Sequence, residues 1–263
     1  MDFQIKEKYN VDDFRKIMAL LRGENGCPWD REQTHESIRR NMLEEAYEAV
    51  EAIDEKSQEH LLEELGDVLM QVLFHAQIEE ELGNFDIDDV ADGACKKLIL
   101  RHPHVFGDVT VKDSGEVLTN WDAIKRVEKN QETVTSSLKA VAKNLPGLWR
   151  AEKVQKKAAK VGFDWDDVKG AVDKLEEEVK ELKRAIEDGA GTEEELGDVL
   201  FSAVNVARFV KADPEVALTK SCDKFISRFE GMENAALHKG RSLQDMTLAE
   251  MDELYNEAKS GKE

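Results

Sequence analysis

The stretch Glu-Glu-Leu-Gly-Asp-Val-Leu at residues 63–69 occurs a second time in this chain, at residues 194–200. A second acidic motif with the pattern Glu-Glu-x-x-Glu precedes each copy, at residues 44–48 and 177–181. Self-similarity at a fixed distance is the mark of a repeated supersecondary unit. The chain therefore contains two copies of one module, and the acidic residues recur in both.

This repeat sets the expected domain organisation. A chain of 263 residues fits one large domain or two smaller ones, and the repeat favours two. Charged residues make up 36% of the sequence and prolines number only four, which favours helices, while alternating apolar and polar stretches are nearly absent. We predict an all-α protein with two tandem helical-bundle domains, residues 1–131 and 147–263, joined by a linker at 132–146.

Hydrophobic periodicity and helix-breaking residues predict five helices in each half. In the first half they span about residues 11–22, 37–54, 59–82, 86–101 and 114–131. In the second half they span about residues 148–161, 168–187, 193–211, 214–238 and 248–259. A loop with Trp-Asp precedes the acidic helices of each half, and a proline at 103 should end the fourth helix.

The acidic motifs of the first half have the spacing of two facing helices. Glu45 and Glu48 lie on one face of their helix, and Glu64 and Asp67 lie on one face of the next. An antiparallel hairpin centred on Lys56 places Glu45 level with Asp67 and Glu48 level with Glu64. We therefore expect four carboxylates to converge.

The second half keeps the same symmetry although its connection is shorter. A hairpin centred on Asp188 places Glu178 level with Asp198, and Glu181 level with Glu195. Converging carboxylates repel one another unless a cation lies between them. Oxygen ligands without histidine or cysteine favour a hard ion, Mg²⁺ or alternatively Mn²⁺.

Simpler interpretations compete with a metal site. A single Glu-x-x-Glu in so acidic a chain is often a solvated helix face, and Thr192-x-x-Glu195 also fits a helix-capping box. Level pairing in two copies favours the metal interpretation. Gly66 and Gly197 lie inside the predicted helices, where glycine is unfavourable, and this predicts close approach of a neighbouring helix or a ligand.

Basic and aromatic residues also recur at matching positions. Lys224 and Arg228 lie one turn apart and can clamp phosphates, the arginine with two hydrogen bonds; Lys97 and Arg101 match them. Each is also consistent with an ordinary surface charge. Aromatic residues that can either stack on a base or anchor a loop occupy four matched positions: Trp29 with Trp165, and Trp121 with Tyr255.

Composition excludes several classes of function. The net charge of −20 argues against nucleic-acid binding and against anionic membrane surfaces. Three scattered cysteines without Cys-x-x-Cys indicate neither a disulfide framework nor a zinc site. No apolar stretch approaches the roughly 20 residues of a membrane span, and no signal peptide is recognisable at the N-terminus. We expect a cytoplasmic protein.

With these motifs, and with Gly-Cys-Pro-Trp-Asp at 26–30 and Arg-His-Pro-His-Val-Phe at 101–106, the chain closely resembles the two-domain form of the MazG family. The resemblance implies a nucleoside triphosphate pyrophosphohydrolase. Such an enzyme hydrolyses NTPs and dNTPs, with broad base tolerance, to the monophosphate and pyrophosphate, and it cleans the nucleotide pool. The resemblance also implies Mg²⁺ as cofactor and a homodimer built through helix bundles.

Carried over residue by residue, the resemblance implies two sets of metal ligands: Glu178, Glu181, Glu195 and Asp198, and Glu45, Glu48, Glu64 and Asp67. It also implies nucleotide-binding residues in the second half: Lys174, Glu177, Lys224, Arg228 and Tyr255, with Trp165 as a further candidate for base stacking. The chain departs from the family at two points. Tyr255 replaces a tryptophan, and the turn before Glu195 lacks a lysine that some relatives carry.

The expected chemistry is in-line attack of a water on the α-phosphorus, with pyrophosphate as leaving group. Glu177 is a candidate general base. We rank the second half first, because its Lys-x-x-x-Arg helix continues past Arg228 whereas His-Pro follows Arg101. Both ligand sets are complete, so two working sites, or one copy devoted to assembly, are alternatives.

A different class of function also fits the sequence. A regulatory or scaffold protein, a helical dimer whose acidic surface binds a basic protein partner, would show tight protein binding and no metal-dependent turnover. The two roles do not exclude each other. Canonical, damaged and alarmone-linked nucleotides are all open as the physiological substrate.

Overall fold

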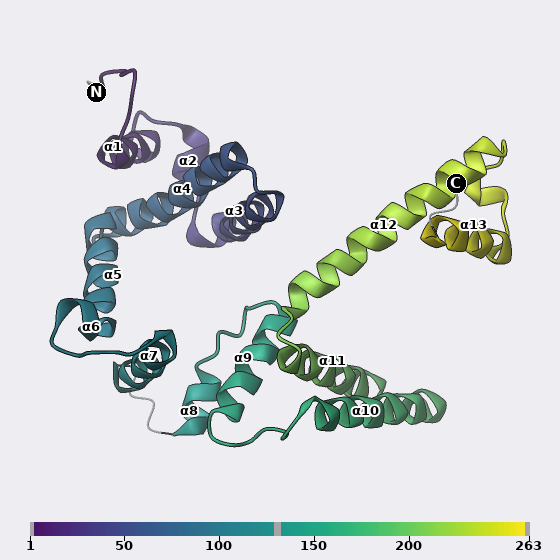
Figure 1. The fold of residues 1–263 in the computed structure, drawn as a ribbon. Helices are drawn as coiled ribbons and strands as arrows, with labels where there is room; N and C mark the ends of the chain where they lie inside the picture. The colour runs from purple at the N-terminus through teal and green to yellow at the C-terminus, as the bar shows by residue number, and fades with distance from the viewer. Residues whose placement is uncertain (1–2, 129–132, 261–263) are drawn as a thin grey trace. The chain divides into compact units, whose positions relative to one another are not determined.

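The structure, a computed structural model, describes residues 3–128 and 133–260 of the chain (Figure 1). Across these residues it contains thirteen α-helices and one short 3₁₀ helix, and no strand. The prediction of an all-α fold is confirmed. The chain divides into two compact units, Met1–Lys125 and Arg126–Glu263, each of which is described by itself below.

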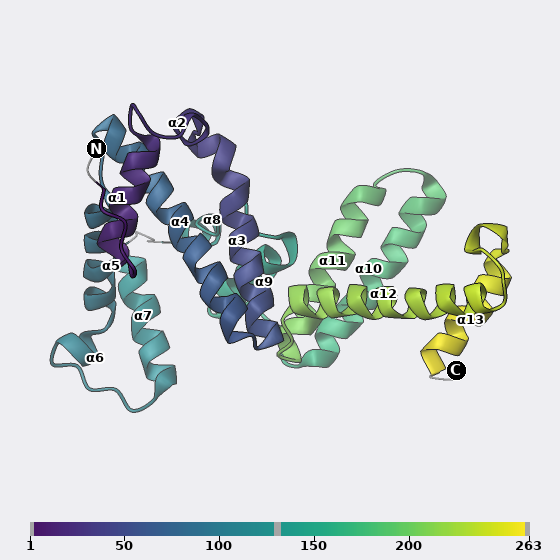
Figure 2. The same cartoon turned by 90° about the horizontal axis from the view of Figure 1, so that it is seen from above.

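Unit 1 is built around an antiparallel helical hairpin. Its helices are α1 (Val11–Arg22), α2 (Pro28–Glu32), α3 (His35–Glu55), α4 (Gln58–Leu82), α5 (Ile87–Arg101), α6 (Pro103–Phe106) and α7 (Ser114–Glu128). Helices α3 and α4 form the hairpin, and α1 packs against α4 (Figure 2). Four buried side chains form the core: Met18, Ile38, Phe74 and Ile78.

Local sequence explains the ends of this hairpin. The Thr34 side chain accepts a hydrogen bond from the backbone N–H of Ser37, and the Ser37 side chain accepts one from Thr34, which is a capping box at the start of α3. Lys56 ends α3 in the left-handed conformation, with φ 57°. Ser57 then caps α4 by accepting from the N–H of His60. The predicted hairpin centre, Lys56, is the observed turn.

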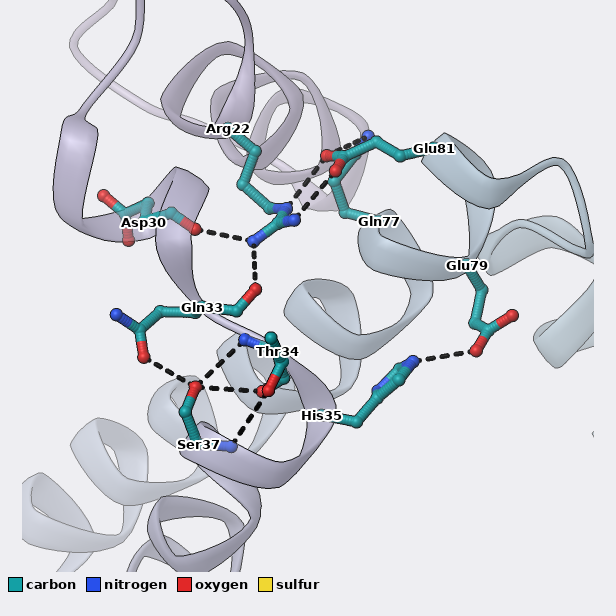
Figure 3. Close-up of polar contacts among 9 residues, drawn as sticks. All are labelled: Arg22, Asp30, Gln33, Thr34, His35, Ser37, Gln77, Glu79 and Glu81. Carbon is teal, nitrogen blue, oxygen red and sulfur yellow. Dashed lines mark hydrogen bonds and ion pairs between the residues drawn. The ribbon is translucent and has the colours of Figure 1, made fainter.

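A buried arginine fastens the loop that carries the Gly-Cys-Pro-Trp-Asp motif (Figure 3). Arg22, whose side chain is only 6% exposed, donates to the backbone carbonyls of Asp30, at 2.6 Å, and Gln33, at 3.2 Å. The same guanidinium donates to both carboxylate oxygens of Glu81, at 2.9 and 2.8 Å. Because these bonds join α1, the loop and α4, they fix the entry of the chain into α3.

Unit 2 repeats the hairpin. Its elements are α8 (Val134–Lys139), α9 (Gly147–Ala159), α10 (Val168–Asp188), α11 (Thr192–Phe209), α12 (Pro214–His238), η1 (Leu243–Asp245) and α13 (Leu248–Ser260). Helices α10 and α11 pair closely. The turn between them uses Gly189 and Gly191, with φ 69° and 76°, a left-handed conformation that favours glycine.

Helix α12 leaves this hairpin. Its first turns contact α9 and α11, and its second half packs on α13 through Met232, Ala236 and Leu254. Figures 1 and 2 both show α12 diverging from α10 and α11 beyond this base. Residues on the second half of α12 are therefore held by α13 and not by the acidic hairpin.

Short helices account for most differences from the sequence prediction. Helix α2 lies in the predicted loop that carries Trp29-Asp30, and α6 begins at the proline that was predicted to end the fourth helix. Pro28 and Pro103 are favourable first residues of a new helix. Helix α8 lies inside the predicted linker and packs on α9. Residue 132 of that linker, and residues 129–131 of the predicted helix before it, lie outside the described residues.

Candidate metal and nucleotide site

The unit 1 hairpin brings three of its four predicted ligands together. One carboxylate oxygen each from Glu45, Glu48 and Glu64 lies within 4.8 Å of the other two. Asp67 is not in this group. Its charge nevertheless acts on the site, because burial and then the negative charge of Asp67 raise the pKa of Glu45.

The unit 2 hairpin produces the same arrangement. One oxygen each from Glu178, Glu181 and Glu195 lies within 4.8 Å of the others. Burial, the charge of Glu181 and the charge of Asp198 raise the pKa of Glu195. The predicted convergence of facing carboxylates is thus present in both units for three residues of the four.

The donor set fits a hard divalent cation. Glu64 and Glu178 are each only 6% exposed. The Oε2 atom of Glu64 is buried and has no hydrogen-bond partner among the described residues. Burial, and next the charge of Glu48, raise the pKa of Glu64. A buried carboxylate oxygen without a donor is costly, and a magnesium ion would supply the missing positive charge.

Lys174 distinguishes the unit 2 cluster. Its Nζ atom lies 2.8 Å from Glu177 Oε1 and 2.8 Å from Glu178 Oε1. These hydrogen bonds, to Glu177 first and Glu178 second, raise the pKa of Lys174. The hydrogen bond from Lys174 lowers the pKa of Glu177. Glu177 is therefore a carboxylate at neutral pH, and Lys174 and Glu177 both lie beside the acidic cluster.

Two side chains lie at the unit 1 cluster that the sequence alone did not assign to it: Gln71, and His60, for which the sequence indicated only a structural role. Gln71 is 5% exposed, and its Nε2 atom donates to Glu45 Oε1 at 3.5 Å. His60 Nε2 lies 3.2 Å from Glu64 Oε1. Their spacing from Glu64, seven residues after it and four before it, places both on the carboxylate face of α4 and is the signal that could have found them.

The two glycines of the acidic helices lie in open surroundings. A Cβ atom built on Gly66 or Gly197 would meet nothing within 4 Å among the described residues. The prediction that a neighbouring helix approaches them closely is wrong for the single chain. Close approach at these two glycines would therefore have to come from a ligand or from a second chain.

The predicted phosphate-binding pair does not reach the carboxylates within one chain. Lys224 and Arg228 lie on α12, which diverges from the hairpin (Figure 1). Tyr255 lies on α13, where it packs against the cluster around Met232, with its ring centroid 5.8 Å from that of Phe225. The structure does not bring these three residues to the acidic cluster.

The matched residues of unit 1 are engaged in local packing. Arg101 is 7% exposed, and its guanidinium lies 5.3 Å from the ring centroid of Trp121. His102 contacts the same indole ring edge-on, at 4.8 Å between centroids. Of the two interpretations of Trp121, the structure supports the anchor.

The loop tryptophans are partly exposed, Trp29 to 57% and Trp165 to 46%. A Cβ atom on Gly170 would come within 2.9 Å of the Trp165 indole, so this ring lies directly on the first turn of α10. Arg208 holds the same loop by donating to both carboxylate oxygens of Asp164. Trp165 is therefore an anchored ring with part of its surface open to solvent.

Comparison with known proteins agrees with this geometry. A model of the MazG nucleotide pyrophosphohydrolase domain matches the chain twice, at residues 33–106 and 167–232. The chain belongs to the MazG family. Each match contains one acidic hairpin, so the repeat deduced from the sequence is a repeat of the MazG domain.

Several relatives match this chain over nearly its whole length. A Thermotoga maritima protein named nucleoside triphosphate pyrophosphohydrolase/pyrophosphatase MazG is 46% identical over 96% of each chain. An Escherichia coli K12 protein named nucleoside triphosphate pyrophosphohydrolase is 42% identical over 95% of this chain and 97% of its own. The uncharacterized protein YabN of Bacillus subtilis is 53% identical, and the match spans 95% of this chain but 52% of YabN.

These relatives confirm the resemblance and the assignment of this MazG chain to a family of pyrophosphohydrolase enzymes. No helix within the described residues is long and apolar enough to cross a membrane.

Proposed function

We propose that this MazG protein hydrolyses nucleoside triphosphates, both NTPs and dNTPs, to the monophosphate and pyrophosphate in a Mg²⁺-dependent reaction. The observation that carries the proposal is the convergence of three glutamates within 4.8 Å on each hairpin. Two relatives that match over nearly their whole length are named nucleoside triphosphate pyrophosphohydrolases. Broad base tolerance and a role in cleaning the nucleotide pool belong to the same proposal.

The carboxylates would hold the ion. In unit 2 the holders are Glu178, Glu181 and Glu195, with Asp198 beside them. A magnesium ion bound there supplies charge neutralisation for the triphosphate and acidifies a water for attack on phosphorus; Mn²⁺ is an alternative. Glu177, ionised beside the cluster, is the candidate to accept the proton of that water.

Basic residues of the chain would bind the phosphates. Lys174 already lies at the cluster on a flexible stem, and its ammonium can donate to phosphate oxygens. Unit 1 has Asn41 at the matching position, four residues before the first ligand glutamate. This difference supports unit 2 as the principal catalytic unit.

A homodimer is part of the proposal. Because α12 diverges from the hairpin of its own chain, a second chain would have to bring Lys224 and Arg228 to the phosphates. The α10–α11 hairpin also exposes large apolar side chains that a partner would cover: Ile186, Leu196, Leu200 and Phe201. We also propose, separately, that a basic regulatory protein could bind the acidic surface of this chain.

The test is pyrophosphate release from a panel of NTPs and dNTPs, measured with Mg²⁺ and with EDTA. Wild type should release pyrophosphate only with the metal, and Glu178→Ala should abolish release. Glu187→Ala, an exposed change on the same helix, is the matched control and should be active. Glu45→Ala reports on unit 1. No release from any nucleotide would replace this proposal with the scaffold function.

A further inference from the structure

The two acidic clusters differ in how their most buried carboxylate is satisfied. In unit 2, Glu178 is 6% exposed and accepts a hydrogen bond from Lys174 Nζ at 2.8 Å. Lys174 stands four residues before Glu178 on the same helix. The position four residues before Glu45 is Asn41, which carries no charge. Unit 2 therefore has an ammonium at the cluster, whereas unit 1 has an uncharged amide at that position and the imidazole of His60 against Glu64.

Unit 1 instead leaves buried acceptors without donors. Glu64 Oε1 has His60 Nε2 at 3.2 Å, but the Oε2 atom of Glu64 has no hydrogen-bond partner in the described part of the chain. Gln71, 5% exposed, donates from Nε2 to Glu45. Its own Oε1 is buried and has no donor within the same described residues. Two buried acceptors of α4, Glu64 Oε2 and Gln71 Oε1, thus lack a donor among the described residues.

A hydrated divalent ion held by the carboxylates would supply the positive charge and the water donors that these two acceptors lack. Magnesium binds through one or two carboxylates and usually keeps several waters. The ion would neutralise Glu64 Oε2, and one of its waters would donate to Gln71 Oε1. If the Gln71 amide were flipped, its Oε1 atom would lie beside the Glu45 carboxylate and the two oxygens would repel each other. The orientation in which Nε2 donates to Glu45 is therefore the favourable one. Gln71 is an independent sign of a ligand at this site.

In unit 2 the ammonium and the ion compete. The Nζ atom of Lys174 occupies an oxygen of Glu178, which is one of the three proposed ligands. A positive charge inside the cluster also repels a divalent ion at short range. The Lys174 side chain is 36% exposed, so it can turn outward on its four-carbon stem when an anionic partner arrives.

We propose that the two sites take up their metal differently: unit 1 binds a divalent ion without nucleotide, whereas Lys174 keeps unit 2 from binding one until a triphosphate draws its ammonium away. This inference rests on the proposed metal sites of both hairpins. It makes metal and nucleotide binding mutually dependent in unit 2. Because such coupling is reciprocal, metal tightens nucleotide binding there by the same factor.

The experiment measures binding of Mn²⁺ to the full chain without nucleotide, by calorimetry or by the EPR signal of free Mn²⁺. Wild type should bind one ion per chain tightly. Glu64→Gln should remove this binding, and Glu195→Gln should leave it in place. Adding a non-hydrolysable triphosphate analogue to wild type should create the second site.

Lys174→Met is the decisive variant. It should tighten nucleotide-free binding at unit 2 by roughly tenfold or more, because it removes a unit charge in contact with a ligand oxygen. Lys183→Met removes the same charge from an exposed position of α10 and should change nothing. Equal binding curves for these two variants, or a nucleotide-free wild-type site lost in Glu195→Gln, would overturn the inference.

Gln71→Leu keeps the unit 1 arm testable even if Glu64→Gln fails to fold. Loss of a residue that orients a metal ligand lowers metal affinity about 10–100-fold, and circular dichroism verifies that the variant is helical. Unchanged affinity would overturn the role of Gln71. Mg²⁺-dependent pyrophosphate release on the same preparations separates the two proposals. If turnover is present but Lys174→Met does not tighten metal binding, only this inference is overturned. If both metal binding and turnover are absent, this inference and the proposed function are both overturned.

Discussion

Replacing Arg22 by methionine tests how the Gly-Cys-Pro-Trp-Asp loop of unit 1 is held in place. Arg22 makes two hydrogen bonds to backbone carbonyls and two to Glu81, and its side chain is 6% exposed. The two carbonyl bonds come from a buried charged donor and contribute roughly 3 kcal/mol together. The Glu81 side chain is 38% exposed, so solvent screening reduces that pair to about 1 kcal/mol.

Methionine recovers part of this loss by packing on Phe74, whose ring centroid lies 5.2 Å from the guanidinium carbon. That apolar contact contributes about 1 kcal/mol. The expected decrease in the free energy of unfolding of unit 1 is therefore about 3 kcal/mol. Arg15→Met is the control on the same helix. Arg15 pairs with Asp86 and Asp88 and is 32% exposed, so its loss should cost about 1 kcal/mol or less.

Urea unfolding followed by tryptophan fluorescence measures both variants. A background in which Trp149 and Trp165 are phenylalanine leaves Trp29 and Trp121, so the fluorescence reports only on unit 1. Arg22→Met should lower the urea midpoint several times more than Arg15→Met does. Equal shifts for the two variants would show that burial of the guanidinium, on which the estimate depends, does not set its contribution.

Three further predictions concern pH, packing and helix propensity. Arg241 and the Thr247 cap lower the pKa of Glu250 to about 2. The decrease in unfolding free energy caused by Glu250→Gln, measured by urea unfolding, should therefore be largest above about pH 4.5 and should vanish near pH 2. Gly170→Ala should displace the Trp165 ring and red-shift its emission, because the new Cβ would lie 2.9 Å from it; an unchanged spectrum contradicts that contact. Gly66→Ala should stabilise the protein by up to about 1 kcal/mol and raise its thermal midpoint, since no described atom would lie near the new Cβ. A lower thermal midpoint would show that a ligand or a second chain contacts this position.

Helix positions were predictable because their end signals are local. Helix α12 begins and ends at the predicted residues, since Asp213 caps it and Pro214 opens it. The short helices α2, α6 and α8 were missed because four to six residues are too few to show a period. The pairing of acidic residues was predictable for a related reason: helical spacing and the position of the turn together set which carboxylates are level.

Other features depend on angles and distances between elements that are far apart in sequence. Arg22 donates a hydrogen bond to Glu81, which lies 59 positions away, and nothing in the local sequence specifies Glu81 as its partner. The direction of α12 follows from its contacts with α9 and α13, which decided that Lys224 and Arg228 leave the hairpin of their own chain. The unsatisfied Oε1 of Gln71 could be recognised only once the burial of both hairpin helices was known.

By itself, the sequence determined the all-α class, the internal repeat, the family and the carboxylates that face one another, because each depends on periodicity and spacing along one helix or across one turn. Only the tertiary structure decided which carboxylates meet within 4.8 Å, how Lys174 and Gln71 make the two clusters different, and which basic residues are absent from them. Burial and hydrogen-bond satisfaction are properties of packed neighbours, and a linear pattern does not contain them.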